Sequence, residues 1–458
     1  KMKKILILLL LLTLNLYAEE ETKFIYNGNY RVRGFAGSRD LLLKKASKGT
    51  TPEKEALGYV DTRLAANLGY GITKRLQVHY GFQIGDMRFG GNSNLKQKVQ
   101  TNNPFNPTLI GFDAGGDIGQ KPINLQSTFL YVNYRGETYN IRVGLQQFSS
   151  PNYRVLFANG TGVFINKDFV SVKQSLQGGY IRGNENSIYD KDNNNYNDNL
   201  RPVGMNIGFI KWKYYGLKSN KLEIYVYGYD NNVKNTETGH LYWTGIFYEY
   251  SRGIFSFSIQ PVYQTGVIYT NDKRYAVKGG FIDTDFKYNS PIGTFSTFFI
   301  GSSGRAGTYK DGTTPNYLKG GGYKSLLPLV GVSNIALDYT GGYSLFSPVQ
   351  FSGIYSYGLG YSVRKGMLTI NPAVSAIYSN KTPYIENNKN YTSDKFYSGS
   401  NYIGNEFNLN FIYNLGDYSS KFILRTGIFA ARDGYYTLMD TEKGKYIREV
   451  LLAYQITF

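Results

Sequence analysis

Apolar and polar residues alternate with a period of two along most of this chain. In residues 406–415, one parity carries Phe407, Leu409, Phe411, Tyr413 and Leu415, and the other carries Glu406, Asn408, Asn410 and Asn414. The same alternation recurs in residues 24–35, 75–85 and 138–148. Successive side chains of a β-strand point to opposite faces, so each segment predicts a strand with one apolar and one polar face. No long segment keeps the spacing of an amphipathic helix, and we expect an all-β fold.

The length of these segments indicates where the apolar faces point. Strands of soluble proteins are typically ~5–6 residues long, whereas a tilted strand needs ~9–11 residues to cross a bilayer. The alternating segments are closer to the second length. In a membrane barrel the apolar face meets lipid, the lumen is polar, and closure pairs every backbone N–H and C=O. The pattern therefore predicts a transmembrane antiparallel up-and-down β-barrel.

Short and long links between the strands mostly alternate, as the hairpins of a barrel require. Short links fall at 71–74, 136–137, 216–220, 251–253, 289–292, 364–366 and 416–420, and long polar links fall at 38–57, 86–124, 149–201, 302–333, 380–401 and 433–446. Outer-membrane barrels combine short periplasmic turns with longer outer loops. The segments predict about 16 strands, or about 18 if 169–182 and 335–343 are also strands. We expect the long link 149–201 to fold into the pore.

Both ends of the chain support an exported barrel. A basic start, an unbroken Ile/Leu run over residues 5–12 and the small residue Ala18 predict a signal peptide over residues 1–18, with Met2 as the start. The run is too short for a membrane-spanning helix, which needs ~20 apolar residues. We expect the barrel to occupy residues 19–458. Its last strand ends in Tyr454, Ile456 and Phe458, which resemble the terminal signal of the barrel-assembly machinery, and we place this end at the periplasmic rim.

Composition agrees with a wall that is apolar on one side. The 458 residues include 44 Tyr and 28 Phe, yet the mean hydropathy is −0.35 because polar residues separate the apolar ones. The chain has no cysteine, which excludes disulfides and thiol chemistry. Its formal net charge of +18 favours anionic solutes over cationic ones.

Basic residues share the polar parity of the predicted strands. A Lys or Arg that faces lipid at mid-membrane costs ~2–4 kcal/mol, so these side chains are expected to point into the lumen, where they favour anions. Alternatively, they pair with lumenal acids such as Asp61 and Glu406, or lie near the rim. The predicted anion path consists of Arg31, Arg33, Arg63, Arg142, Arg154, Lys211, Lys213, Lys421 and Arg425.

Other candidate sites are weaker. Asp190, Asp192, Asn194 and Asp198 partly follow the spacing of a calcium loop, but Asn195 replaces the turn glycine and Arg201 the last acidic ligand. A solvated outer loop is the favoured interpretation, and no metal or other cofactor is expected.

The two histidines, His79 and His240, lie in no catalytic motif, so we expect no enzymatic activity. No N-terminal plug domain is recognisable.

Residues 130–160 and 209–229 resemble a stretch of the alginate-export porins. Tyr134, Arg135 and Gly136 match a "YxRYRG" strand, Gly144 and Gln146 match an "LGRQ" strand in which Leu145 replaces the Arg, and Arg154 matches a loop Arg. The resemblance covers roughly a tenth to a fifth of the chain. It implies an 18-stranded, substrate-selective barrel with an electropositive pore that passes an anionic saccharide.

The leading hypothesis is a passive channel in the outer membrane of a Gram-negative-type bacterium. Small hydrophilic or anionic solutes would diffuse or be exported through the lumen. The alternative is an adhesin-like surface barrel that binds partners through its long loops. Expected contacts are outer-membrane lipid, lipopolysaccharide and the assembly machinery, and no nucleic acid. Pore size, solute and oligomeric state stay open.

Overall fold

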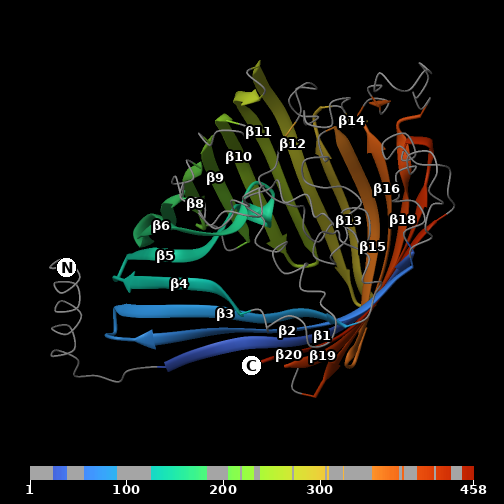
Figure 1. The fold of residues 1–458 in the computed structure, drawn as a ribbon, viewed down its shortest axis with the longest axis horizontal. Helices are drawn as coiled ribbons and strands as arrows, with labels where there is room; N and C mark the ends of the chain where they lie inside the picture. Colours follow the sequence, from blue (N-terminus) through green and yellow to red (C-terminus); the bar gives the residue numbers. More distant parts are fainter. Residues whose placement is uncertain are drawn as a thin grey trace, which may run out of the picture.

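A computed structural model describes residues 24–38, 56–89, 125–182, 205–216, 219–231, 238–270, 273–304, 307–308, 323, 353–380, 384–385, 400–416, 419–434 and 446–458. Eighteen strands form one antiparallel sheet in this part of the chain (Figure 1). They are β1 (Phe24–Ser38), β2 (Ala56–Gly71), β3 (Leu76–Phe89), β4 (Leu125–Arg135), β5 (Tyr139–Ser149), β6 (Phe157–Phe169), β7 (Gln174–Arg182), β8 (Met205–Tyr214), β9 (Asn220–Asn231), β10 (Thr238–Arg252), β11 (Phe255–Thr270), β12 (Lys273–Ser290), β13 (Gly293–Ser302), β15 (Ile354–Lys365), β16 (Leu368–Ser379), β18 (Tyr402–Leu415), β19 (Ser420–Ala431) and β20 (Ile447–Thr457).

The remaining elements are small. β14 (Gly307–Thr308) and β17 (Tyr384–Ile385) form a separate parallel pair, and η3 (Pro151–Tyr153) and η4 (Val170–Val172) are single 3₁₀ turns. Among the described residues, no helix has the length and apolarity that crossing a bilayer would require.

The sheet closes on itself because the first strand pairs with both the second and the last. β1 and β20 pair from Asn29 opposite Thr457 to Ser38 opposite Arg448. Phe458 extends this seam: its N–H donates to the carbonyl of Gly28 at 3.0 Å and its carbonyl accepts from the N–H of Gly28 at 2.7 Å. Closure removes the free strand edges that lipid could not solvate. The predicted transmembrane antiparallel barrel fold is confirmed.

The two faces of the wall differ as the alternation predicts. On β9, Ile224 and Val226 are exposed on the outside, whereas Glu223, Tyr225 and Tyr227 are buried on the inside. On β20, Val450 and Leu452 are exposed and alternate with the buried Leu451 and Ala453. The outer face of these strands is therefore apolar, as contact with lipid requires.

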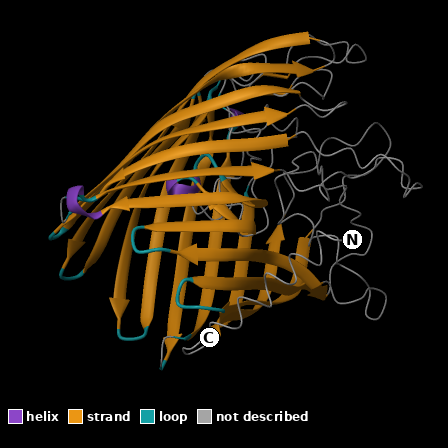
Figure 2. Ribbon diagram, turned by 90° about the vertical axis from the view of Figure 1, so that its left-hand side faces the viewer, coloured by secondary structure: helices purple, strands orange, loops and turns teal. Residues whose placement is uncertain are grey.

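The short turns gather at one end of the barrel (Figure 2). They follow β2, β4, β6, β8, β10, β12, β15 and β18, and the end of β20 lies with them. We call this the short-turn end and the opposite end the long-loop end.

The strand count is 18, and residues 169–182 supply β7 and the end of β6. The other candidate strand, 335–343, lies outside the described residues, as do the predicted signal peptide and the calcium-like loop.

The structure divides the predicted long link 149–201. Residues 150–156 form a short inward loop, whereas β6 and β7 belong to the wall. Residues 183–201 lie outside the described part. The alternating pattern is weak in β6 and β7 because glycines occupy several positions, including Gly160, Gly162 and Gly179.

The closing seam generates the first prediction. A Cβ atom on Gly28 would lie 2.6 Å from the carbonyl oxygen of Ala65 and 2.7 Å from the ring of Phe458, whereas one on Gly34 would meet only the Leu452 carbonyl at 3.9 Å. Gly28→Ala should therefore destabilise the barrel by about 1–3 kcal/mol, the usual cost of overpacking. Gly34→Ala, on the same strand, is the matched control. Gel mobility of unheated and heated samples measures the folded fraction, and equal fractions for both variants would contradict the seam geometry.

Candidate functional site: the barrel lumen

A row of basic residues crosses four neighbouring strands on the inner face of the wall. Lys421 on β19 lies opposite Gln455 on β20, Gln455 lies opposite Arg31 on β1, and Arg31 lies opposite Arg63 on β2. Their parity is opposite to that of the exposed residues Phe422, Leu452 and Tyr30. We call Lys421, Gln455, Arg31 and Arg63 the basic row. Because neighbouring strands are ~4.8 Å apart, the row is about 14 Å wide.

The basic row places like charges side by side. Arg31 directly opposite Arg63 is an unfavourable cross-strand pair. Arg33 lies one step further along β1 on the same inner face and is buried, and Arg425 lies opposite Asn410 on β19. A wall built this way raises the electrostatic potential of the water beside it.

A second group of basic residues lies on β5 and β8. The Arg142 guanidinium lies 4.3 Å from the ring centre of Phe164 and 5.8 Å from that of Tyr131. The Lys211 ammonium lies 5.4 Å from the ring centre of Phe209 and donates to the carbonyl of Ser149 at 3.2 Å. Aromatic faces hold these cations without neutralising them.

Glu223 on β9 reduces the net positive charge of this second group. Its carboxylate accepts from Lys221 at 2.8 Å and lies 3.4 Å from the Lys213 ammonium. The Glu223 side chain is only 3% exposed, so this acid is held in the wall by its cationic neighbours. Lys213 is therefore partly neutralised.

The inward loop, residues 150–156, is pinned to the inside of the wall. The Ser150 hydroxyl accepts from the N–H groups of Val155 and Leu156 at 2.8 and 2.9 Å, which fixes the turn. Tyr227 donates to the Ser149 carbonyl at 3.1 Å, and Gln260 on β11 donates to the Pro151 carbonyl at 3.0 Å. Asn152 and Tyr153 adopt positive φ angles of 46° and 56°. The loop thus contacts strands that are far from β5 and β6.

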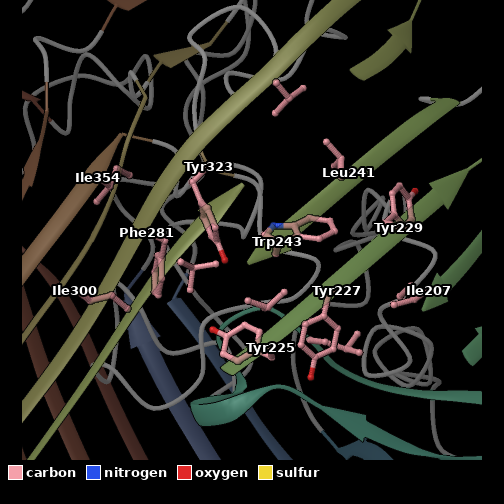
Figure 3. Packing of buried hydrophobic residues seen from close by; sticks show 14 of the residues in the cluster. Ile207, Tyr225, Tyr227, Tyr229, Leu241, Trp243, Phe281, Ile300, Tyr323 and Ile354 are labelled. Carbon is pink, nitrogen blue, oxygen red and sulfur yellow. The ribbon is translucent and has the colours of Figure 1, made fainter. Parts of the chain in front are cut away.

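Arg154 connects this loop to β12. Its Nε donates to the Asp283 carboxylate at 2.7 Å, and both side chains are almost fully buried. Tyr323 stacks on Phe281 with ring centres 4.9 Å apart and donates its hydroxyl to the Arg154 carbonyl at 3.2 Å. Figure 3 shows Tyr323, Phe281 and Tyr225 turned toward the same interior space. Arg154 and Asp283 therefore hold the loop against the inner face of β12.

The lumen is not polar throughout, and this part of the expectation is wrong. Trp243, Leu241, Ile300 and Ile354 are fully buried on the inner face, in one cluster with Val155 and Leu156 of the inward loop (Figure 3). Covering them removes apolar surface from water, which favours the folded loop. The inner wall thus has an apolar packed part and a separate polar part.

The predicted anion-path residues all lie on the lumen side. Arg154 and Lys213 have carboxylate partners. Of the two acids proposed as partners, Asp61 lies opposite Arg33 of β1 in the sheet register, and Glu406 is fully buried on β18. Sequence reasoning missed Glu223, Asp283 and Tyr323. Glu223 shares its parity on β9 with Tyr225 and Tyr227, and this acid could have identified that parity as the inner face. No sequence pattern marks Tyr323 as a residue of the site.

The other candidates are placed as follows. His79 lies on the inner face of β3, stacks on Tyr131 with ring centres 4.8 Å apart and shares a 3.2 Å hydrogen bond with Gln77. His240 lies on the outer face, 2.7 Å from Asp230. Asp190, Asp192, Asn194 and Asp198 lie outside the described residues, within which no cluster of three or more His, Cys, Asp or Glu could hold a metal. Tyr454 packs against Phe422 on the outer face.

The first prediction from the lumen concerns the loop anchor. Asp283→Asn leaves the buried Arg154 without its charge partner, a change that typically costs ~3–5 kcal/mol. The inward loop should detach, and single-channel conductance should rise with more frequent switching between levels. Asp230→Asn, the same change of charge on the outer face of β9, is the control. A conductance unchanged by Asp283→Asn would show that the loop does not narrow the path.

The second prediction concerns Glu223. Glu223→Gln removes the shared counter-charge of Lys213 and Lys221 while keeping the shape of the side chain. The anion-to-cation permeability ratio should rise, because one negative charge at ~4 Å in water is worth ~1 kcal/mol, or about fivefold. Reversal potentials in a salt gradient measure the ratio. The effect should shrink at high ionic strength, and a fall in the ratio would contradict the assignment.

Comparison with known proteins supports the architecture. No protein-family model matches the sequence, and no curated protein matches it. Among solved structures, the chain is similar to Acinetobacter baumannii OccAB1 (TM-score 0.57, 12% identity, 94% of this chain and 96% of that one) and Pseudomonas aeruginosa OccK5 (OpdH) (TM-score 0.54, 12% identity, 94% and 98%). It is also similar to Pseudomonas aeruginosa OccK8 (OprE) (TM-score 0.53, 12% identity, 94% and 98%).

These matches support a porin fold and give no support to the alginate-export resemblance. Leu145, where that resemblance expects Arg, has the parity of the exposed Val143, so this position faces lipid and not the pore. At this level of identity the likeness establishes the fold: a closed 18-stranded antiparallel barrel like those of outer-membrane porins.

Proposed function

We propose that the protein is a passive outer-membrane channel for small hydrophilic solutes that favours anions. The apolar outer face and the closed sheet suit a lipid bilayer. The short turns and long links suit the periplasmic and outer sides of a Gram-negative-type outer membrane, and the likeness in fold to OccK5 (OpdH) and OccAB1 supports this proposal. The channel performs no chemistry, and its solutes move down their gradients.

The observation that carries the anion preference is the basic row. Lys421, Arg31 and Arg63 follow one another through Gln455, and one acid, Asp61, lies beside the row, opposite Arg33. Like charges in direct register destabilise a sheet, so local stability alone does not account for this arrangement. A solute anion that passes the row exchanges part of its hydration for guanidinium and ammonium donors, which bind carboxylate or phosphate oxygens well.

Acids on the inner face oppose this preference: Asp61 lies opposite Arg33, and Glu406 and Glu449 are buried on β18 and β20. Asp283 is occupied by Arg154, and Glu223 by two lysines. Asp285 on β12 is the inward acid closest to Asp283 along the strand. The inward loop contacts β12 at Asp283. A solute at this depth therefore passes between the carboxylates of β12 and the guanidinium of Arg154. Anionic saccharides are among the candidate solutes, because the basic row binds the negative charge of a solute whether or not the solute has a sugar ring.

The rival is a surface barrel that binds partners through its long loops and whose lumen does not conduct. Conductance in planar bilayers distinguishes the two hypotheses, because only a channel gives stable conductance steps. Purified protein without conductance at any applied voltage would favour the rival.

The basic row makes the preference testable by charge removal. Arg31→Ala combined with Arg63→Ala should move the reversal potential in a salt gradient toward that of a non-selective pore. We expect about a fivefold drop in the anion-to-cation permeability ratio, from ~1 kcal/mol of lost attraction at ~4 Å in water. Arg75→Ala is the control, because Arg75 is exposed at the short-turn end, 3.8 Å from Glu137. An unchanged potential in the double variant would rule out the basic row as the selective element.

A further inference from the structure

Three adjacent strands carry an unusual set of residues on their lipid-facing side near the long-loop end. Arg274 on β12 lies opposite Tyr269 on β11, and Lys278 lies opposite Thr265, which in turn lies opposite Tyr242 on β10. Tyr242 and Tyr269 are exposed, and so are both cations. We call Arg274, Lys278, Tyr242, Tyr263 and Tyr269 the outer cationic patch.

The depth of this patch follows from the aromatic residues at the other end of β12. Tyr288 packs against Phe255 with ring centres 5.2 Å apart and against Phe295 at 6.5 Å, which is typical of the belt at a membrane interface. From Tyr288 to Lys278 a strand advances about 33 Å, or about 25 Å along the membrane normal at the usual tilt. This matches the ~25 Å apolar band of such barrels. Lys278 therefore lies at the opposite interface, and Arg274 lies just beyond it.

The patch is not neutralised by its own strands. Outward positions of β10, β11 and β12 carry no Asp or Glu among the described residues. The nearest outward acid is Asp230 on β9, and it pairs with His240 at 2.7 Å. Two exposed cations at a membrane interface complement anionic headgroups.

We propose that the outer cationic patch binds a phosphorylated glycolipid of the outer leaflet. The long-loop end faces that leaflet in the proposed orientation, so the inference rests on the proposed location but not on transport. Arg274 and Lys278 lie about 13 Å apart along the strand, with the small Ala276 between them, which leaves room for a wide headgroup. The guanidinium and the ammonium bind phosphate oxygens. The exposed tyrosines contact the sugar and the upper part of the acyl chains. Tyr263 is one of these tyrosines and occupies the outward position of β11 next to Thr265.

The test measures lipid retention by the purified, detergent-solubilised barrel. Three probes are compared in native mass spectra: lipid A with two phosphates, the same glycolipid without phosphates, and phosphatidylglycerol. The wild type should retain bisphosphorylated lipid A. Arg274→Gln combined with Lys278→Gln should weaken retention at least about tenfold, which corresponds to about 1.4 kcal/mol. Lys167→Gln is the control, because Lys167 is exposed on the same outer face at the short-turn end, 5.9 Å from the ring centre of Tyr139.

Three results would overturn the proposal. They are equal retention by the double variant and the wild type, an equal loss with Lys167→Gln, and phosphatidylglycerol bound as tightly as lipid A. Gel mobility of unheated samples checks that the double variant is folded; if it is not, Lys278→Gln alone serves, with a partial loss expected. Channel conductance should be the same in the double variant and the wild type, so failure of this inference is distinguishable from failure of the proposed function.

Discussion

Pairing of every backbone N–H and C=O is the constraint on which this structure depends. In lipid, an unpaired backbone group costs several kcal/mol, so a sheet can cross the membrane only when its first and last strands meet. The seam between β1 and β20 fulfils this condition, and the backbone of Phe458 adds two hydrogen bonds to Gly28. Once the sheet is closed, the period of two fixes every side chain as lipid-facing or lumen-facing. The basic row, the inward loop and the outer cationic patch all follow from that assignment.

The lumen combines two ways of filling space inside a barrel. One part is packed like a protein core, with Trp243, Phe281 and Tyr323 buried against the wall. The other part carries the basic row, where charge stays beside water. Arg154 and Asp283 join these parts, because they fix the inward loop to β12. Removing one partner of a buried ion pair leaves an uncompensated charge, so this pair keeps the loop in one position against β12.

Much of the wall could be predicted from the sequence, because alternation is a local property. The inward direction of Arg31, Arg63 and Lys421 follows from the apolar residue next to each, Tyr30, Leu64 and Phe422. The strand count stayed between about 16 and 18 because the Gly-rich β7 alternates weakly. Alternation alone does not assign the faces of β9, because both parities are apolar: Ile224 and Val226 face lipid while Tyr225 and Tyr227 face inward.

Contacts across the barrel could not be predicted at all. Arg154 and Asp283 are 129 residues apart, and Tyr323 and Arg154 are 169 apart. Such contacts depend on how loops fold into the lumen, and no periodic pattern encodes that. The expectation of a wholly polar lumen failed for the same reason, since a loop that enters the barrel needs apolar partners there.

The assignment of faces is tested most directly by single cysteines, because the chain has none of its own. In membrane-embedded protein, an anionic, membrane-impermeant thiol reagent should modify Arg31→Cys through the aqueous lumen and leave Tyr30→Cys unmodified. A lipid-soluble maleimide should show the opposite preference. If the impermeant reagent modified Tyr30→Cys and spared Arg31→Cys, the basic row would lie outside the barrel and the account would be wrong.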